Sequence, residues 1–123
     1  MIVAGFGFTS RATMDSLLQA LEATGIKPAT IHRIATAHDK AAHPAILDLA
    51  RAHKWQIEAI QPRPLETAMT ETQSFLSRLM RRTGSVAEAA ALASAGQSAR
   101  LIVTRQISND RMATCAIAKG PDT

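Results

Sequence analysis

Short continuous apolar runs alternate along the chain with apolar residues at helical spacing, and this alternation predicts the order of strands and helices. Residues 2–8 are apolar with two glycines, which predicts a buried first strand that ends in a tight turn. The next segment predicts a helix over about residues 12–23 that stops at Gly25. Its apolar positions are Met14, Leu17, Leu18 and Leu21. A second strand over residues 31–36 completes a strand–helix–strand unit, which is almost always right-handed and parallel.

The middle of the chain repeats this alternation. Residues 44–53 form an apolar helical pattern with a proline in the first turn, where the missing N–H costs nothing. Residues 55–60 then predict a third strand. A Thr-x-x-Gln capping box at residues 70–73 predicts the start of another helix, which closes at Gly84.

An alanine-rich helix is predicted over residues 85–95, with Gly96 as its terminator. Ser85 and Glu88 have the spacing of a capping box, in which each side chain satisfies the other residue's exposed backbone N–H. This capping role is the leading interpretation of Glu88.

Two β-prone runs, residues 101–107 and 112–118, end the predicted order. Ser108-Asn109-Asp110 lies between them and is typical of a hairpin loop, so these strands should be antiparallel. The whole pattern predicts an α/β fold. Specifically, it predicts a three-layer α/β/α sandwich around a mixed, mostly parallel sheet of about five strands that ends in an antiparallel hairpin.

The composition fits one folded domain. The chain has 123 residues, of which 46% are hydrophobic and 20% charged, close to ordinary globular usage. We expect a single domain over residues 1–119 and a flexible tail over residues 120–123. A lone cysteine, Cys115, cannot form an internal disulfide and suggests a reducing compartment. No apolar run reaches the roughly 18–20 residues that span a bilayer, so a cytoplasmic protein without a membrane partner is expected.

The charge favours anionic partners. The net charge is +4 and the isoelectric point is about 10.0, which suits phosphates, nucleic acid or polycarboxylates. Only 3% of the residues are aromatic, which leaves little for bases to stack on and argues against a single-stranded nucleic-acid binder.

The loops that follow the first two strands are the first candidates for a site, because ligands of open α/β sheets bind beyond the carboxyl ends of strands. In the first loop, Gly5 and Gly7 permit close backbone approach, and Ser10 and Arg11 precede a helix that can receive an anion. The alternative is a tight turn capped by Thr9 or Ser10. A dinucleotide site is disfavoured because it needs a third glycine near Ser10 and an acidic residue after the second strand.

The second loop runs from Thr36 to Lys40 and gathers a hydroxyl, an imidazole, a carboxylate and an ammonium. Its alternative interpretation is a capped helix entry with solvated charges. Asp39 and Glu88 are weak candidates for a general acid or base. The four histidines have no i, i+4 pair on a helix and none lies beside Cys115, so we expect no metal site. Cys115 itself should be a packed, unreactive thiol in a strand.

Four segments, spread in order over nearly the whole chain, carry a combined signal. The most specific is the Gly-Ser-Val-Ala-Glu-Ala-Ala-Ala-Leu stretch over residues 84–92. The others are Gly5-Phe6-Gly7 with Arg11, the loop from Thr36 to Lys40, and Ala113-Thr114-Cys115-Ala116-Ile117-Ala118. Taken together, they resemble the family of CobE and the C-terminal domain of CbiG.

The resemblance implies a role in cobalamin biosynthesis, and its ligand would be a precorrin-type tetrapyrrole that carries many carboxylates. The expected role is accessory or carrier binding without a cofactor, with other enzymes of the pathway as further partners. Two alternatives stay open: an enzyme that acts on a precorrin, and a protein-interaction module that uses the alanine-rich helix. The expected ligand contacts are Gly5, Gly7, Ser10, Arg11, Thr36, Asp39, Lys40, Ser85, Val86 and Glu88.

Overall fold

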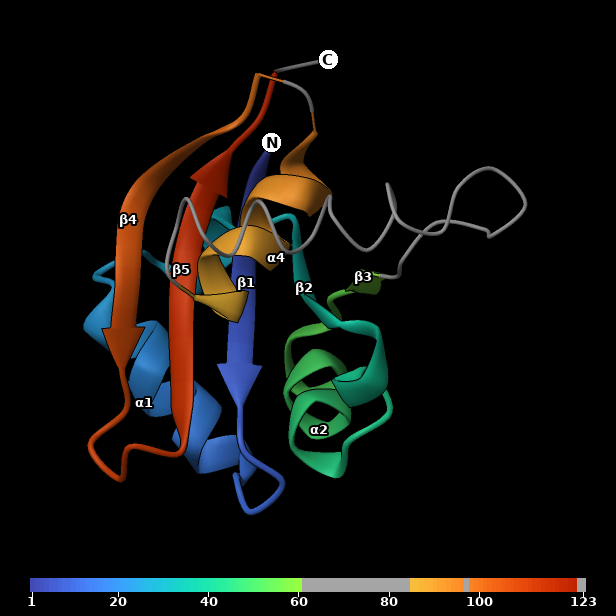
Figure 1. Cartoon of the computed structure of the whole chain (residues 1–123), viewed down its shortest axis with the longest axis vertical. Helices are drawn as coiled ribbons and strands as arrows, with labels where there is room; N and C mark the ends of the chain where they lie inside the picture. The colour runs from blue at the N-terminus through green and yellow to red at the C-terminus, as the bar shows by residue number, and fades with distance from the viewer. Residues whose placement is uncertain (61–84, 97, 122–123) are drawn as a thin grey trace.

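One sheet of five strands organises the molecule (Figure 1). The computed structural model describes residues 1–60, 85–96 and 98–121. The strands are β1 (Ile2–Phe8), β2 (Arg33–Ala37), β3 (Ile57–Ile60), β4 (Arg100–Ile107) and β5 (Ala113–Lys119). They lie in the order β3-β2-β1-β5-β4. The pairs β1–β2 and β2–β3 are parallel, while β5 is antiparallel to both of its neighbours.

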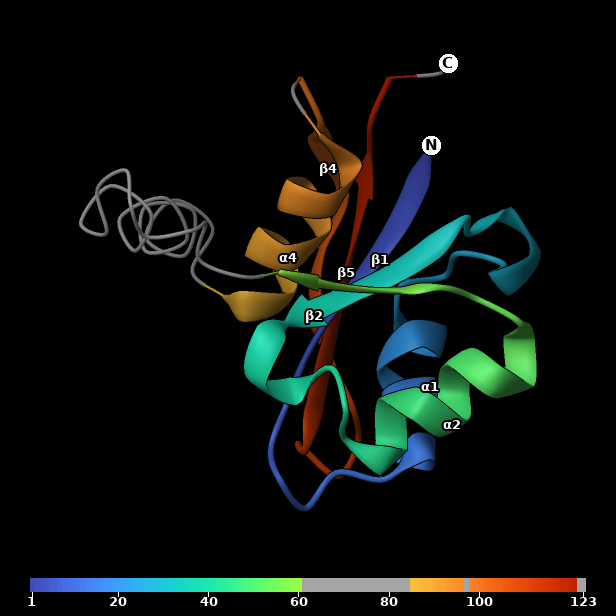
Figure 2. The same cartoon turned by 90° about the vertical axis from the view of Figure 1, so that its right-hand side faces the viewer.

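Helices cover both faces of the sheet, as Figure 2 shows. The helices α1 (Met14–Ala23) and α2 (Pro44–His53) lie on one face, and α4 (Val86–Ala95) lies on the other. Two short 3₁₀ turns, η1 (Pro28–Thr30) and η2 (His38–Lys40), flank β2. The predicted three-layer α/β sandwich with a mixed sheet and a terminal hairpin is therefore confirmed. The helix predicted before Gly84 lies outside the described residues.

The two faces of the sheet have different cores. The α1 and α2 face buries large side chains, among them Phe6, Leu17 and Ile46. The α4 face is filled by small residues, among them Ala90 and Ala91. Small side chains let a helix backbone approach a sheet closely, so the two cores set different distances between their layers.

Gly5 shows how close α4 lies to β1. A Cβ atom at Gly5 would lie 2.2 Å from the carbonyl oxygen of Ala87 and 2.6 Å from the backbone nitrogen of Ala91. Both contacts are to helix backbone, which cannot move aside as a flexible side chain can. Gly5 is therefore required by packing, because any side chain would push α4 away from the sheet.

The caps of the helices differ in part from the prediction. The N-cap of α1 is Thr13, not Thr9 or Ser10, and it forms a reciprocal capping box with Ser16. The prediction missed it because Ser16 stands where the usual pattern has Glu or Gln. Gly25 and Gly96 follow the ends of α1 and α4 with φ of +74° and +100°, as predicted for helix terminators.

The folded body extends one residue beyond the predicted boundary at residue 119. Gly120 is buried, and its N–H donates a hydrogen bond to the carbonyl of Met1 at 2.8 Å. A Cβ atom there would lie 2.1 Å from the carbonyl oxygen of Ala95. Gly120 thus closes the sheet against the end of α4 and is not part of a frayed tail. Within the described ranges, no helix has the length and apolarity needed to cross a membrane.

Candidate functional site

Three segments that are distant in sequence meet at the carboxyl end of β1. Gly7 faces the start of α4, since a Cβ atom on it would lie 3.4 Å from Cβ of Val86. Phe8 faces η2, where Nζ of Lys40 lies 5.8 Å from the centroid of its ring. The loop between β4 and β5 joins them, because the N–H of Thr9 donates to the carbonyl of Met112 at 2.9 Å. The predicted juxtaposition of the first loop, the second loop and the start of α4 is therefore present.

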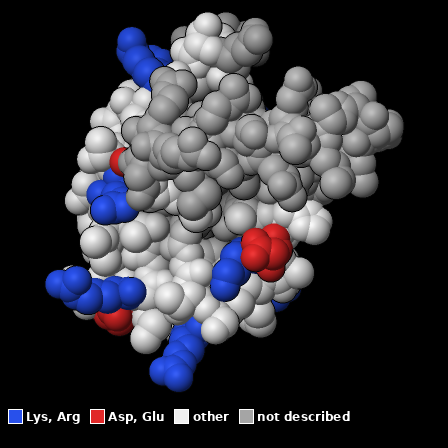
Figure 3. All heavy atoms as spheres, in the orientation of Figure 1, with Lys and Arg blue, Asp and Glu red and all other residues white. Residues whose placement is uncertain are grey.

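A pocket of about 250 Å³ opens at this junction on the side of α4. Its walls come from the end of β1, the start of α4 and the hairpin loop with the start of β5. The lining residues are Gly7, Phe8, Thr9, Val86, Arg111, Met112, Ala113 and Thr114. On the face seen in Figure 3, the visible Lys and Arg side chains lie apart from one another and form no merged basic patch.

His43 fastens the first loop to α2. Its Nδ1 accepts a hydrogen bond from the N–H of Ala45, so Nε2 carries the proton of the neutral ring and donates to the carbonyl of Ser10 at 2.9 Å. The same ring meets Phe8 edge-on, with centroids 5.2 Å apart. Sequence analysis considered His43 only as a metal ligand and missed this role, which no local spacing reveals.

The predicted residues of the first loop lie in three different surroundings. Ser10 and Arg11 are exposed, and neither lines the pocket. Gly5 is buried beneath α4, so its prediction as a ligand contact is corrected: its missing side chain serves helix packing. Gly7 is the glycine of this loop that lines the pocket.

The second loop divides into buried and exposed parts. Thr36 is fully buried, and its hydroxyl donates to the carbonyl of Phe6 at 2.9 Å. Its prediction as a ligand contact is therefore also corrected, because the hydroxyl ties β2 to β1. Asp39 is exposed, and Lys40 is half-buried over the ring of Phe8. Lys40 does not line the pocket, and it supplies the ammonium group of this loop.

The start of α4 is capped in one direction only. Oγ of Ser85 accepts from the N–H of Glu88 at 3.0 Å, as predicted. The carboxylate of Glu88 does not return the bond: its Oε2 accepts from the N–H of Arg105 at 2.9 Å, at an irregularity of β4. Glu88 is 4% exposed, and its buried Oε1 has no hydrogen-bond partner among the described residues. The predicted reciprocal box is wrong for Glu88, and its catalytic candidacy is weakened because it links α4 to β4.

The hairpin loop contains a polar network centred on Asp110. Oδ1 of Asp110 accepts hydrogen bonds from the hydroxyl of Ser108 at 2.6 Å and the N–H of Met112 at 2.9 Å. Its Oδ2 accepts from the hydroxyl of Ser16 in α1, also at 2.6 Å. These bonds, led by the one from Ser108, hold the pKa of Asp110 below its usual value.

Arg111 follows this anchored carboxylate and lines the pocket. Sequence analysis recognised the loop but not Asp110 or Arg111 as site residues. Ser16 and Asp110 are 94 positions apart, so their contact leaves no pattern in the chain. The only available signal is an Asp-Arg pair at the end of a hairpin loop, which is common on protein surfaces.

Cys115 lies in β5 with no exposed surface, and burial raises the pKa of its thiol. It is a packed core residue, as expected. Among the described residues, His, Cys, Asp and Glu side chains form no group of three or more that could hold a metal ion.

Comparison with known proteins decides the family. Residues 2–118 match the family described as Cobalamin synthesis G C-terminus. The chain belongs to this family. The resemblance to CbiG and CobE is thereby confirmed, and the protein is a cobalamin biosynthesis protein of that type.

Solved structures of cobalamin biosynthesis proteins share the fold. Cobalamin biosynthesis protein chiG from Agrobacterium tumefaciens str. C58 is 28% identical with a TM-score of 0.72, and the match covers 99% of this chain and 100% of that one. CobE, a protein from the cobalamin (vitamin B12) biosynthetic pathway, is 25% identical with a TM-score of 0.72 over 96% of this chain and 89% of its own.

A cobalamin biosynthesis protein G homolog from Sulfolobus solfataricus, at 18% identity and a TM-score of 0.68, shares the fold over 98% of this chain and 37% of its own. A comparison with curated protein sequences found no significant match.

Proposed function

We propose that the protein binds a precorrin-type tetrapyrrole at the carboxyl end of β1, in an accessory or carrier role. Intermediates of corrin-ring synthesis carry acetate and propionate arms, so a protein that holds one must receive carboxylates. The main support is the meeting of the end of β1, the start of α4 and the β4–β5 loop around one pocket, with Arg111 in its wall. Lys40 adds a second cation at this end of the sheet, over the ring of Phe8. Both cations suit a carboxylate.

The size of the pocket decides which part of the ligand enters. At about 250 Å³ it is smaller than the roughly 300–1,000 Å³ of sites that enclose a drug-sized ligand. It therefore suits one carboxylate arm, while the macrocycle stays outside. A hydrogen bond to a charged group contributes roughly 1.5–3 kcal/mol, so a few such contacts give a reversible affinity that suits transfer of a labile compound.

The buried role of Glu88 favours binding over catalysis. Its carboxylate is occupied by the N–H of Arg105 and is nearly inaccessible, so it is poorly placed to exchange protons with a ligand. The packing of α4 also favours ligand binding over the interaction module, because Ala90, Ala91 and Ala95 pack in the core of the domain. Those alanines leave little free surface for a partner.

The test is to incubate the purified protein with precorrin intermediates and record absorbance and mass together. A spectral shift with unchanged ligand mass is the expected result. A new product mass would replace the carrier role with an enzymatic one. Capture of a pathway enzyme by pigment-free protein, with no spectral shift, would favour the interaction module instead.

A further inference from the structure

Arg111 has a backbone conformation that its side chain does not favour. Its φ is +62°, in the left-handed region that glycine adopts freely and long side chains rarely adopt. The N–H of Arg111 closes a turn on the carbonyl of Ser108 at 2.9 Å. Hairpin loops usually place glycine at a left-handed position of this kind. The fold itself therefore gives no reason for an arginine there.

The loop around Arg111 is nevertheless firmly held. Asp110 accepts bonds from both sides of the loop and from Ser16 of α1. The N–H of Asn109 also donates to the side chain of Gln19 at 2.9 Å. With the bond from Thr9 to Met112, the loop is tied to α1 and to the end of β1. The backbone of Arg111 is thus part of a loop that is fixed by hydrogen bonds to other elements.

The charge of Arg111 is not neutralised by any residue in the described part of the chain. No described residue forms an ion pair with it, although it lines the pocket. An arginine on a fixed backbone loses less conformational entropy on binding a carboxylate than an arginine on a mobile loop does. Its guanidinium can bind the carboxylate through two parallel hydrogen bonds. We propose that Arg111 is the residue that selects for a carboxylate arm in this pocket. This inference rests on the proposed function and adds the residue that sets its specificity.

The test uses uroporphyrin, a porphyrin with acetate and propionate arms, and its methyl ester, which keeps the shape but not the charges. Arg111→Met should weaken uroporphyrin binding roughly ten- to a hundredfold, the loss expected for one charged hydrogen-bonding group. Arg111→Lys should lose less, because a lysine keeps the charge but not the bidentate geometry. The ester should bind wild type and variant alike.

Two controls separate recognition from general charge and from folding. Arg100→Met removes the same side chain from the far end of the same hairpin and should change binding by no more than about twofold at matched ionic strength. Arg111→Gly relieves the left-handed strain, so it should fold at least as stably as wild type yet bind as poorly as Arg111→Met. A residue with a merely structural role would lose stability and binding together.

The two proposals fail in different ways. If wild type and Arg111→Met bind uroporphyrin equally, the selection by Arg111 is wrong while tetrapyrrole binding stands. If wild type binds no uroporphyrin, a titration with glutarate followed by NMR decides about Arg111 alone. Shifts of the Gly7 and Val86 amides that vanish in Arg111→Met support it, and no shift in wild type overturns it.

Discussion

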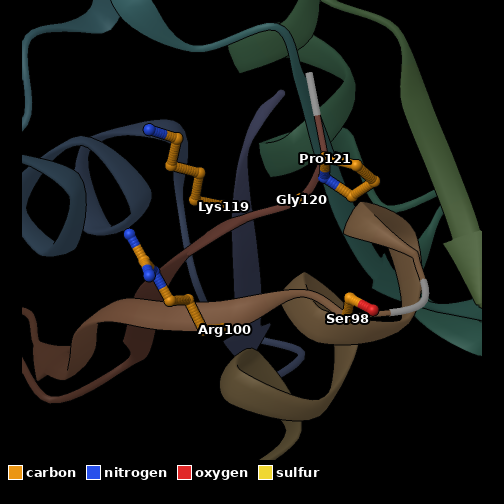
Figure 4. Close-up of a pocket in the computed structure, with 5 residues that line it drawn as sticks. All are labelled: Ser98, Arg100, Lys119, Gly120 and Pro121. Carbon is orange, nitrogen blue, oxygen red and sulfur yellow. The ribbon is translucent and has the colours of Figure 1, made fainter. Parts of the chain in front are cut away.

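The two ends of the sheet carry pockets of similar volume, and each is lined by basic side chains. The structures that position these side chains differ. The pocket at the carboxyl end of β1 measures about 250 Å³, and the one at the opposite end measures about 220 Å³. The second is lined by Ser98, Arg100, Lys119, Gly120 and Pro121. Figure 4 shows Arg100 and Lys119 extending in the same direction, while Ser98 and Pro121 lie apart from their charged ends.

The cations of the opposite pocket have no anchored carboxylate behind them among the described residues, although Gly120 in its wall is hydrogen-bonded to Met1. Arg100 and Lys119 are direct cross-strand partners in β4 and β5, where like charges disfavour pairing. Charged residues on an edge strand such as β4 commonly prevent pairing with other chains. Arg111, in contrast, lies in a loop that the hydrogen bonds of Asp110 hold in place. The two pockets are therefore alike in volume and in having basic side chains. They differ in the backbone that carries those side chains, because only Arg111 follows a carboxylate that is hydrogen-bonded to other elements.

The largest expected effect tests the packing that brings α4 to the site. Gly5→Ala places a Cβ atom 2.2 Å from the carbonyl oxygen of Ala87, so it should destabilise the fold by about 3 kcal/mol or more. Thermal unfolding followed by circular dichroism measures this. Gly25→Ala is the control, since no atom lies within 4 Å and only its positive φ opposes a side chain. It should cost about 1–2 kcal/mol, and equal losses at both positions would contradict the close approach of α4.

The next effect concerns the loop anchor. Asp110→Asn should destabilise the protein at neutral pH, because the ionised carboxylate accepts hydrogen bonds from Ser108, Ser16 and Met112. The folded-state pKa of Asp110 is lowered from 3.8, so its contribution is present above that value. It is lost as the pH falls below 3.8 through the folded-state pKa.

The wild type and Asp110→Asn should therefore differ in urea unfolding midpoint at pH 7 and converge in strongly acidic solution. Asp48→Asn is the matched control, because the Asp48–Arg51 pair is exposed and should contribute little. A difference that grows as the pH falls would contradict the assigned hydrogen bonds.

A smaller effect probes the space in the pocket. Gly7 has no positive φ, so its constraint is the surrounding space and not its backbone conformation. In Gly7→Ala the new Cβ atom would lie 3.1 Å from Oγ1 of Thr114 and 3.4 Å from Cβ of Val86. It should cost about 1 kcal/mol of stability and reduce uroporphyrin binding several-fold, as measured by fluorescence titration. Unchanged binding would place the ligand elsewhere.

The smallest effect is expected at the opposite pocket. Replacing Arg100 and Lys119 together by Met removes a repulsive cross-strand pair, so stability should change by less than about 1 kcal/mol, towards a more stable protein. Uroporphyrin binding at matched ionic strength should stay within about twofold of wild type. A loss as large as that of Arg111→Met would remove the contrast between the two ends.

The fold was largely predictable because its signals are local. The runs that form β1, α2 and the β4–β5 hairpin carry their own periodicity, proline or turn residues, and these agree with the structure. The site was less predictable. Thr36 and Ser85 lie where polar residues often bind ligands, yet their hydroxyls serve the fold. Whether a polar group is already occupied depends on residues far along the chain.

The site residues that the sequence analysis missed also depend on contacts between distant parts of the chain. Asp110 and Arg111 belong to the site because α1 and the end of β1 fold against their loop. Glu88 has the spacing of a capping residue but bonds to β4, because the irregular pairing of that strand leaves the N–H of Arg105 for it. Spacing predicts contacts within an element, whereas these contacts join different elements.

Cys115 can serve as a native probe of how often the sheet opens. It is the chain's only cysteine and sits, fully covered, in a strand bordered on both sides by other strands. A thiol reagent reaches it only when the sheet opens, so the rate of labelling reports that opening without an added probe. Ligand that binds the closed protein should slow the labelling in proportion to its occupancy.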